Sequence, residues 1–360
     1  MADVTFKESI CIQVPKIHGQ QTLVLANKLQ INDRELEIQK NEHFIYVPLI
    51  RQPSENELIV LKAQVPDFQL KGYVFPERRP REKTLVEVLE NQLPPHLLAS
   101  LPRALDIVGD IAIIEIPPEL KAHGSLIGEA ILKTHKNIRT VLTKAGAVSG
   151  TYRLRELDIV AGERRTVTIH KEYGCEFHVD IAKVYFSPRL SHEHKRVASL
   201  VQKGETVVDL FAGVGPFSVL IAKNHEDAKV YAVDVNPEAI ELLKRNIRLN
   251  RVENQVFPVL GNARQVVVDK LLGVADCVIM NLPEKAIEFV DAACGAIKPA
   301  GGTVHFYGFV RLPDTLENMK LRFAEAVGKV GRKVDRYLLA KTVRETAPYE
   351  WQVVLDTKVL

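Results

Sequence analysis

The 360-residue sequence is 46% hydrophobic and 26% charged, which is ordinary for a folded protein of two or three domains. No apolar run reaches the roughly 18 residues that span a membrane, and no basic start precedes an apolar signal core, so we expect a cytoplasmic protein without a membrane partner. The four cysteines have no paired spacing, so we expect neither a disulfide framework nor a metal site.

Residues 1–72 are predicted to form a small α+β domain. The stretches SICIQV, HFIYVPL and ELIVLKAQV have the short apolar pattern of strands, and QQTLVLANKLQ has that of a helix. The prolines and charges of FPERRPREKT then favour a linker, which we place at residues 73–84.

Residues 85–179 are predicted to form a second α+β domain. LVEVLENQLPPHLLASLP is helical and broken by prolines, ALDIVGDIAIIEI has the pattern of a strand, and GSLIGEAILKTHKNIRTVLTKAG predicts a helix followed by a strand. Residues 133–171 hold nine Lys and Arg against three Asp and Glu, although the whole chain has a formal net charge of only +3. Such a basic segment indicates contact with phosphates; a solvated basic face without a partner is the alternative.

The cofactor motif lies in TVVDLFAGVGPFS, residues 206–218, and a second apolar strand that ends at Asp234 follows it. A strand, a glycine pair, a helix start and an acidic residue about 20 positions on is how an open α/β sheet holds an adenosine-type cofactor. Gly213 and Gly215 let the backbone turn sharply and a ligand approach. Asp234 is placed to accept hydrogen bonds from a ribose diol, with a helix-capping role as its alternative. Ser218 replaces the third glycine of the dinucleotide pattern, which favours a more compact ligand over a dinucleotide.

Two further strands bring side chains to the same edge of the predicted sheet. QVFPVLGNARQV ends a third strand at Gly261 and Asn262, and the Asn262 side chain is expected to face the adenine edge. ADCVIMNLPEKAIEFV is apolar until it delivers Asn281 and Pro283 to its carboxyl end, outside which ligands bind in parallel sheets. The residue after this tripeptide is Glu284.

The DLFAGVGPFS stretch resembles the first motif of S-adenosylmethionine-dependent methyltransferases, and Asn-Leu-Pro resembles the catalytic fourth motif of nucleic-acid methyltransferases. Enzymes of that kind that act on exocyclic amines usually show Asn-Pro-Pro and then an aromatic residue that stacks on the flipped base. Because Glu284 cannot stack, the departure favours a ring nitrogen or carbon as the methyl acceptor.

The combination of CIQVPK, TYRLREL, AKVYFSPRLSHEHKR, DLFAGVGPFS, NLP and VRETAPYEW resembles the archaeal and eukaryotic family of tRNA guanosine-37 N1-methyltransferases over nearly the whole chain. The resemblance implies an α/β fold, with a class I (Rossmann-like) methyltransferase domain at residues 180–360 preceded by the two smaller α+β domains. It also implies S-adenosylmethionine as cofactor and tRNA as partner, with residues 1–72 on the outer corner and the basic domain on the anticodon arm. We expect a monomer.

The matching motifs carry over a set of site residues. Glu193 resembles the family's general base for the guanine N1 proton, and Arg153 resembles the partner of guanine O6. Arg189 and Asn281 resemble residues that fix the target loop, and Pro283 completes the predicted catalytic set. The predicted cofactor-binding residues are Asp209, Phe211, Ala212, Gly213, Gly215, Asp234, Asn236, Asn262, Ala263 and Asn281.

Other interpretations stand beside this one. His192 and His194 flank Glu193 and are taken as solvated helix residues, because no third ligand stands at a spacing that would bind a metal. Tyr185 either holds the donor or the base, or packs under the sheet edge. A related wyosine-pathway enzyme would methylate a tricyclic intermediate or transfer an aminocarboxypropyl group at the same tRNA position. A non-catalytic RNA-binding protein is the alternative from a different class.

Overall fold

The computed structural model describes residues 5–78, 83–146, 150 and 152–360. The chain forms two compact units, Met1–Lys83 and Thr84–Leu360. Each unit has a hydrophobic core of its own. Residues 79–82 of the predicted linker and Thr151 of the TYRLREL motif lie outside the described residues.

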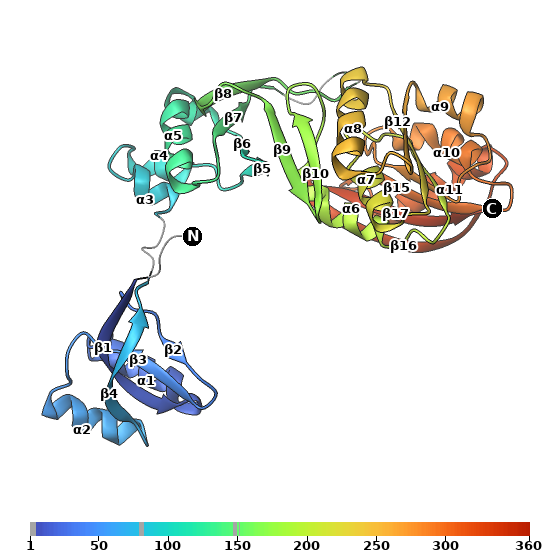
Figure 1. The fold of residues 1–360 in the computed structure, drawn as a ribbon. Helices are drawn as coiled ribbons and strands as arrows, with labels where there is room; N and C mark the ends of the chain where they lie inside the picture. The colour runs from blue at the N-terminus through green and yellow to red at the C-terminus, as the bar shows by residue number, and fades with distance from the viewer. Residues whose placement is uncertain (1–4, 79–82, 147–149, 151) are drawn as a thin grey trace. The chain divides into compact units, whose positions relative to one another are not determined.

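The first unit is an antiparallel sheet in the order β2-β3-β1-β4, packed with two helices (Figure 1). Ile12, Val14 and Val47 of the sheet pack with Leu25 and Leu61 of the helices, and all five are buried. The elements are β1 Phe6–Pro15, the 3-10 helix η1 Lys16–His18, α1 Gly19–Lys28, β2 Gln39–Lys40, β3 Phe44–Pro48, α2 Glu55–Gln64 and β4 Gln69–Pro76.

The prediction of a strand at ELIVLKAQV is wrong, because this stretch lies mainly in α2. Ser54 caps the helix: its hydroxyl accepts a hydrogen bond from the Glu57 N–H, and the Glu57 carboxylate accepts one from the Ser54 N–H. Leu61 then points to the core, whereas Ile59 and Val60, which contribute to the apolar pattern that predicted a strand, are exposed. The capping box of Ser54 and Glu57 therefore favours a helix over a strand in the apolar stretch that follows it.

Strand β4 continues to Pro76, beyond the predicted end of the first domain at residue 72. Phe75 is fully buried and joins a small cluster with Cys11, Leu36 and Tyr46. Because this packing fixes Phe75 in the sheet, the first two residues of FPERRPREKT belong to the strand and not to the linker.

The second unit begins with a sheet in the order β5-β6-β7-β8, in which β6 and β7 are parallel and joined across α5. ALDIVGDIAIIEI, predicted as one strand, forms β5 and β6, which turn back on each other at Gly109 with φ +58°. The elements are α3 Leu85–Leu89, α4 Pro95–Ala99, β5 Asp106–Val108, β6 Ile111–Ile114, η2 Pro118–His123, α5 Gly124–Thr134, β7 Thr140–Lys144 and β8 Leu157–Gly162, followed by the hairpin β9 Val167–Glu172 and β10 Cys175–Asp180.

A sheet in the order β13-β12-β11-β14-β15-β17-β16 follows (Figure 1). Strands β11 to β15 are parallel, and β17 and β16 add an antiparallel edge. The strands are β11 Thr206–Asp209, β12 Lys229–Asp234, β13 Val256–Leu260, β14 Cys277–Met280, β15 Gly302–Arg311, β16 Val334–Ala347 and β17 Glu350–Val359. The order reverses between β11 and β14, which is where open α/β sheets bind ligands.

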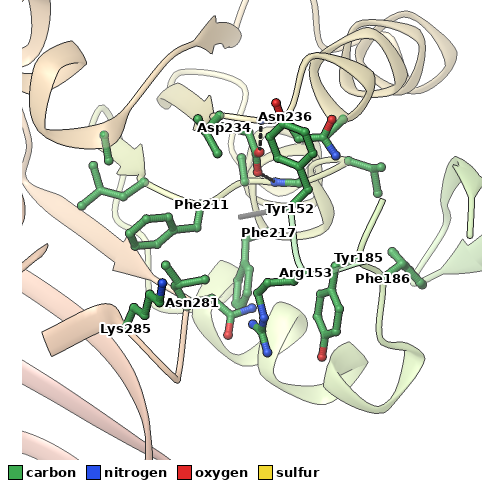
Figure 2. Close-up of a pocket in the computed structure, with 18 of the residues that line it drawn as sticks. Tyr152, Arg153, Tyr185, Phe186, Phe211, Phe217, Asp234, Asn236, Asn281 and Lys285 are labelled. Atoms are coloured by element: carbon green, nitrogen blue, oxygen red, sulfur yellow. Dashed lines mark hydrogen bonds between the residues drawn. The ribbon is translucent and has the colours of Figure 1, made fainter. Parts of the chain in front are cut away.

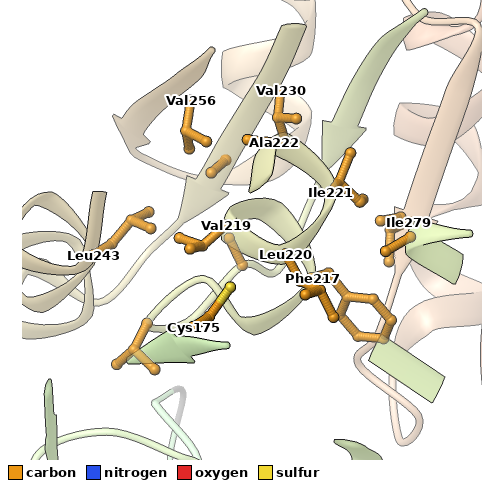
Figure 3. Packing of buried hydrophobic residues seen from close by; sticks show 14 of the residues in the cluster. Cys175, Phe217, Val219, Leu220, Ile221, Ala222, Val230, Leu243, Val256 and Ile279 are labelled. Carbon is orange, nitrogen blue, oxygen red and sulfur yellow. The ribbon is translucent and has the colours of Figure 1, made fainter. Parts of the chain in front are cut away.

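Helices cover both faces of this sheet. Val207 and Val208, neighbours on β11, point to opposite faces and join two different cores. The first core includes α6, α7 and α8, with Phe217 and Leu243 among its buried residues (Figure 3), and the second includes α9, α10 and α11. The elements are η3 Pro188–Leu190, α6 Ser191–Ala198, α7 Pro216–Asn224, α8 Pro237–Asn250, α9 Ala263–Val266, the π-helix η4 Val267–Leu271, η5 Ala286–Phe289, α10 Val290–Ala296 and α11 Leu316–Lys329.

Across the described ranges, no helix is both long and apolar enough to cross a membrane. The same residues contain no group of three or more His, Cys, Asp or Glu side chains arranged to hold a metal ion. The four cysteines are free and buried.

Candidate active site

A cavity of about 260 Å³ lies where β11, β12 and β14 end, beside the reversal of strand order (Figure 2). Its walls come from segments far apart in the sequence, because the carboxyl ends of parallel strands meet at one edge of a sheet. Of the predicted site residues, it brings together Arg153, Phe211, Ala212, Gly213, Asp234, Asn236, Asn262, Ala263 and Asn281.

The glycine loop after β11 forms one wall of the cavity. Gly213 and Gly215 have φ of +56° and +90°, in the left-handed region that side chains disfavour. A Cβ on Gly215 would stand 2.4 Å from Cδ1 of Leu243, so this position also requires the absence of a side chain. Pro216 then begins α7, where its missing N–H costs no hydrogen bond.

Asp234 stands at the end of β12 and is fixed by the loop it faces (Figure 2). One carboxylate oxygen accepts the N–H of Gly213 at 2.7 Å, and the other accepts the N–H of Asn236 at 2.9 Å. Burial raises the pKa of Asp234 despite these hydrogen bonds. Asn236 caps α8 through the Glu238 N–H and also donates to the Lys183 carbonyl, so both cavity residues are held in place.

Asn262 lines the cavity with Ala263, but its side-chain oxygen is already in use. It accepts the N–H of Arg264 at 3.0 Å and caps α9. Phe211, which follows β11, packs edge to face against the ring of Phe289, with ring centroids 5.2 Å apart. These contacts leave an apolar and amide-lined slot, a surface suited to a flat heterocycle.

Arg153, in the segment between β7 and β8, lines the cavity (Figure 2). Its guanidinium carbon lies 4.6 Å from the centroid of the Tyr185 ring, and one of its nitrogens lies 3.2 Å from the Glu284 carboxylate. The Nε of Arg153 and the side-chain oxygen of Asn281 are both buried and have no hydrogen-bond partner within the described ranges. The arrangement thus offers a donor and an acceptor to a polar planar ligand.

Glu284 explains the departure from the aromatic residue that ends related motifs. Its carboxylate is half exposed and pairs with Arg153, which stands 131 positions earlier in the chain. The sequence showed that Glu284 cannot stack, but it contained no signal for this partner, because the two residues meet only through tertiary packing.

Glu193, the predicted base, does not line the cavity. Its carboxylate lies on the side of α6 that faces β15 and β16, where it accepts hydrogen bonds from the Tyr307 hydroxyl at 2.9 Å and from Arg196 at 2.8 Å, with the Lys341 ammonium at 2.9 Å. Burial raises the pKa of Glu193, but these donors outweigh burial and lower it below its ordinary value. The carboxylate is thus an ion held by three partners.

Four other predicted residues are also absent from the cavity wall. Asp209 is fully buried beneath the loop, where burial raises its pKa to about 7 and the Ser218 hydroxyl donates to it at 2.9 Å. Gly215 shapes the loop from behind. Pro283 does not line the cavity, and Arg189 lines a neighbouring one and pairs with Asp106.

The prediction that His192 and His194 are both solvated is wrong for His194. His192 is exposed, but the His194 side chain is only 2% exposed and lines the cavity. Its Nδ1 lies 2.8 Å from the carboxylate of Glu172 on β9. The helical position alone could not separate the two histidines, because their exposure depends on which side of α6 packs against the sheet.

A second cavity of about 390 Å³ adjoins the first and shares Arg153 with it. The cationic side chains of Lys144, Arg155, Arg189 and Arg344 also line it. The Nε of Arg155 is buried without a hydrogen-bond partner in the part of the chain that the structure describes. Lys144 and Arg155 belong to the basic segment singled out by the sequence, and the acidic side chains of Asp106, Glu284, Glu345 and Glu350 line the same cavity.

The chain matches three family descriptions: the TRM5/TYW2 methyltransferase domain at residues 168–336, the TYW2 N-terminal domain at 85–166 and the tRNA methyltransferase 5 N-terminal domain at 11–57. It is 38% identical over 351 residues to the tRNA (guanine(37)-N(1))-methyltransferase Trm5b of Pyrococcus abyssi, with 98% of this chain and 99% of that protein covered. The chain belongs to the TRM5/TYW2 methyltransferase family.

Two further relatives match this chain: a solved structure with tRNA and a methyltransferase that acts on 4-demethylwyosine. The solved complex of aTrm5 and tRNALeu matches with a TM-score of 0.72 and 34% identity, covering 97% of this chain and 99% of that one. The tRNA 4-demethylwyosine(37)-methyltransferase Taw21 of Saccharolobus solfataricus is 33% identical over 77% of this chain and 99% of its own. The predicted class I S-adenosylmethionine-dependent methyltransferase fold, preceded by α+β parts, is confirmed.

Proposed function

We propose that this protein transfers the methyl group of S-adenosylmethionine to N1 of guanosine 37 in tRNA, next to the anticodon. The observation that carries the proposal is a single cavity in which a nucleoside-type edge, Asp234 with Gly213, meets a base-reading edge, Arg153 with Asn281. The Pyrococcus abyssi relative, which is similar over the full length, supports guanine N1 as the acceptor.

The residues present fit the methyl donor. The Asp234 oxygens keep lone pairs for a ribose diol beyond the two backbone hydrogen bonds they accept. At Gly213 the space where a Cβ would stand meets only the Tyr185 carbonyl, at 3.8 Å, so a ligand can approach the backbone. When bound, S-adenosylmethionine supplies an electrophilic methyl group on a sulfonium.

Arg153 suits the role of O6 partner. As guanine N1 loses its proton, negative charge spreads to O6, and a pre-placed guanidinium stabilises that charge. Stacking on Tyr185 and pairing with Glu284 hold the guanidinium in the cavity before a substrate arrives, and its buried Nε has no other partner in the described structure. Asn281 offers its amide to the remaining base edge.

The assignment of Glu193 as the general base stays a prediction. Guanine N1 carries its proton at neutral pH, so an acceptor within hydrogen-bond reach is needed. To serve, Glu193 would have to leave Tyr307, Arg196 and Lys341 and turn towards the cavity.

For tRNA binding, the proposal places the anticodon arm against the second cavity. Lys144, Arg155 and Arg344 stand there beside Arg153, which suits contact with phosphates around a base flipped into the first cavity. The solved tRNA complex of a relative supports tRNA as the partner. We further assign residues 1–72 to the outer corner of the tRNA and propose a cytoplasmic monomer.

The proposed function is tested by nucleoside mass analysis. Unmodified tRNA carrying guanosine 37 is incubated with the full-length protein and S-adenosylmethionine, beside the same transcript with adenosine at position 37. We expect 1-methylguanosine with the first transcript and none with the second. Methylation of both transcripts, or of neither, contradicts the assignment.

The same experiment tests the wyosine-pathway alternative, which the Taw21 relative brings into view. On tRNA that carries the tricyclic intermediate, a methylated tricyclic product without 1-methylguanosine on the unmodified transcript would favour it. A gain in mass larger than one methyl group would indicate aminocarboxypropyl transfer.

Deleting the first unit should weaken tRNA use and leave donor binding intact. The unit Thr84–Leu360 keeps the whole cavity and its own cores, so the dissociation constant for S-adenosylmethionine should stay within about twofold of that of the full chain. The KM for tRNA should rise at least about tenfold, because a contact area is lost. Calorimetry and steady-state methylation measure the two quantities, and loss of donor binding would contradict this division of labour.

A further inference from the structure

The three donors that hold the Glu193 carboxylate differ in how far solvent can reach them. Oε2 of Glu193 accepts hydrogen bonds from the Tyr307 hydroxyl of β15 at 2.9 Å and from Nε of Arg196 at 2.8 Å. Oε1 lies 2.9 Å from the Lys341 ammonium of β16. Tyr307 is fully buried and the Arg196 side chain is 20% exposed, whereas the Lys341 side chain is 42% exposed. Of the three, Lys341 is therefore the donor that a ligand can reach most readily.

The two cations of this group also differ in what remains if Glu193 moves away. The Arg196 guanidinium donates to both oxygens of Asp356 on β17 and would stay paired. Lys341 has no second carboxylate within the described ranges, so another anion must replace Glu193 there. Removing one partner of a buried ion pair is costly chiefly because the other charge is left alone. Release of Glu193 thus depends on a new anion for Lys341.

The strand register places Lys341 close to the second cavity. Lys341 pairs with Val354 of β17. Arg344, which lines the second cavity, pairs with Gln352, since a register shift lies between Thr342 and Arg344. Val354 and Gln352 stand two positions apart on β17, so their partners on β16 project from the same face of the sheet, about 7 Å apart. The long flexible stem of a lysine spans most of that distance, so an anion bound beside Arg344 lies within its reach.

We propose that Lys341 is a positioning residue for Glu193 that exchanges this carboxylate for a backbone phosphate of the bound tRNA. The proposal rests on the function proposed above, with the anticodon arm against the second cavity. In the free protein, the Lys341 ammonium holds the carboxylate outside the first cavity. When a phosphate arrives beside Arg344, the ammonium turns to it. Glu193 then turns towards the guanine while Arg196 stays paired with Asp356, so the base is released only when tRNA is in place.

A double-mutant cycle in tRNA binding tests the exchange. Glu193→Gln removes the carboxylate that competes with the phosphate, so the dissociation constant for guanosine-37 tRNA should fall by at least about fivefold. In a Lys341→Met background, the same Glu193→Gln change should have no such effect. Fluorescence anisotropy with the full-length protein measures all four dissociation constants. Equal tightening in both backgrounds would mean that Glu193 opposes tRNA binding without the lysine, and it would overturn the proposal.

The salt dependence of tRNA binding tests the phosphate contact itself. In Lys341→Met, the slope of the logarithm of the binding constant against the logarithm of the salt concentration should be shallower by about one. Lys341→Arg, which keeps the cation, should keep the slope. The exposed Lys333, just before β16, is the matched control, and Lys333→Met should change neither the slope nor the coupling. An unchanged slope in Lys341→Met contradicts the contact.

The pH dependence of methylation separates an exchanged partner from a permanent one. Burial raises the pKa of Glu193, and its donors, Lys341 among them, outweigh burial and lower it. In Lys341→Met the pKa of Glu193 should therefore rise, and the acid limb of kcat/KM for tRNA, which reports the free protein, should move to higher pH. The acid limb of kcat, which reports the complex, should not move. An equal shift of both limbs would keep the lysine on the carboxylate during the reaction and overturn the exchange.

Failure of this proposal and failure of the proposed function give different results. The binding cycle and the salt slope do not depend on methylation. Wild-type protein that binds tRNA without forming 1-methylguanosine would overturn the proposed function, and the cycle would still decide whether Lys341 exchanges partners. Formation of 1-methylguanosine without coupling between Lys341 and Glu193 would leave the function intact and overturn the exchange.

Discussion

Replacing Arg153 with alanine is expected to lower the rate of methyl transfer by about 100- to 1,000-fold. This is the usual effect of removing one pre-placed donor from a developing oxyanion, and Arg153 lines the cavity together with Asn281 and a second cation, Lys285. Its guanidinium is anchored by Tyr185 and Glu284 before the base arrives, so little reorganisation is needed. Single-turnover rates on guanosine-37 tRNA measure the loss.

Graded variants show whether geometry or charge matters at this position. Arg153→Lys keeps the charge but loses the planar fork and the stacking on Tyr185, so it should recover only part of the rate. Arg245→Ala removes a cation from the exposed face of α8 and serves as the control, with a rate close to that of the wild type. Asp234 and Gly213, which are proposed to bind S-adenosylmethionine, lie elsewhere in the cavity. The affinity for S-adenosylmethionine should therefore be unchanged in all three variants. An Arg153→Ala enzyme that loses only donor affinity would contradict the O6 role.

Replacing Asp234 with asparagine is expected to weaken the binding of S-adenosylmethionine by about tenfold to a hundredfold. Hydrogen bonds to a charged group contribute about 1.5–3 kcal/mol each, and every 1.4 kcal/mol is about tenfold in affinity. The substitution also puts an amide donor where the carboxylate now accepts N–H groups from Gly213 and Asn236, so the glycine loop loses part of its support. Isothermal titration of the protein with the donor measures the change.

The exposed Asp227, in the turn before β12, provides the matched control for Asp234. Asp227→Asn removes the same charge from the same part of the domain and should leave donor affinity unchanged. At saturating donor, the Asp234→Asn enzyme should recover most of its transfer rate, because Asp234 does not face the base-reading edge. Equal loss in the two variants would mean that net charge, and not the carboxylate of Asp234, determines affinity.

The cofactor half of the site was predictable because its signal is local. The sharp turn at Gly213 and Gly215 and the acidic end of the next strand lie within one strand-helix-strand unit, and the sequence spacing fixes their meeting. Asp209 was predicted to bind the cofactor because it stands in the same motif. Its side chain instead lies beneath the loop at the end of β11, where it accepts a hydrogen bond from Ser218. Alternation along a strand sends neighbouring side chains to opposite faces, so adjacency to a motif does not place a residue in its cavity.

The sequence by itself determined the family, the fold class, the donor loop and the identity of the residues at the base-reading edge. Only the tertiary structure decided which of them face the substrate. Arg153 and Glu284 meet across 131 positions, and His194 meets Glu172 across 22, which no spacing rule could predict. Glu193 and His194 are neighbours and both are buried, yet their side chains are turned about 100° apart around α6 and have different partners. The rotation of that helix is set by the burial of Val197 and Ala198 in the sheet core, and a sequence motif records the order of side chains along a helix but not this rotation.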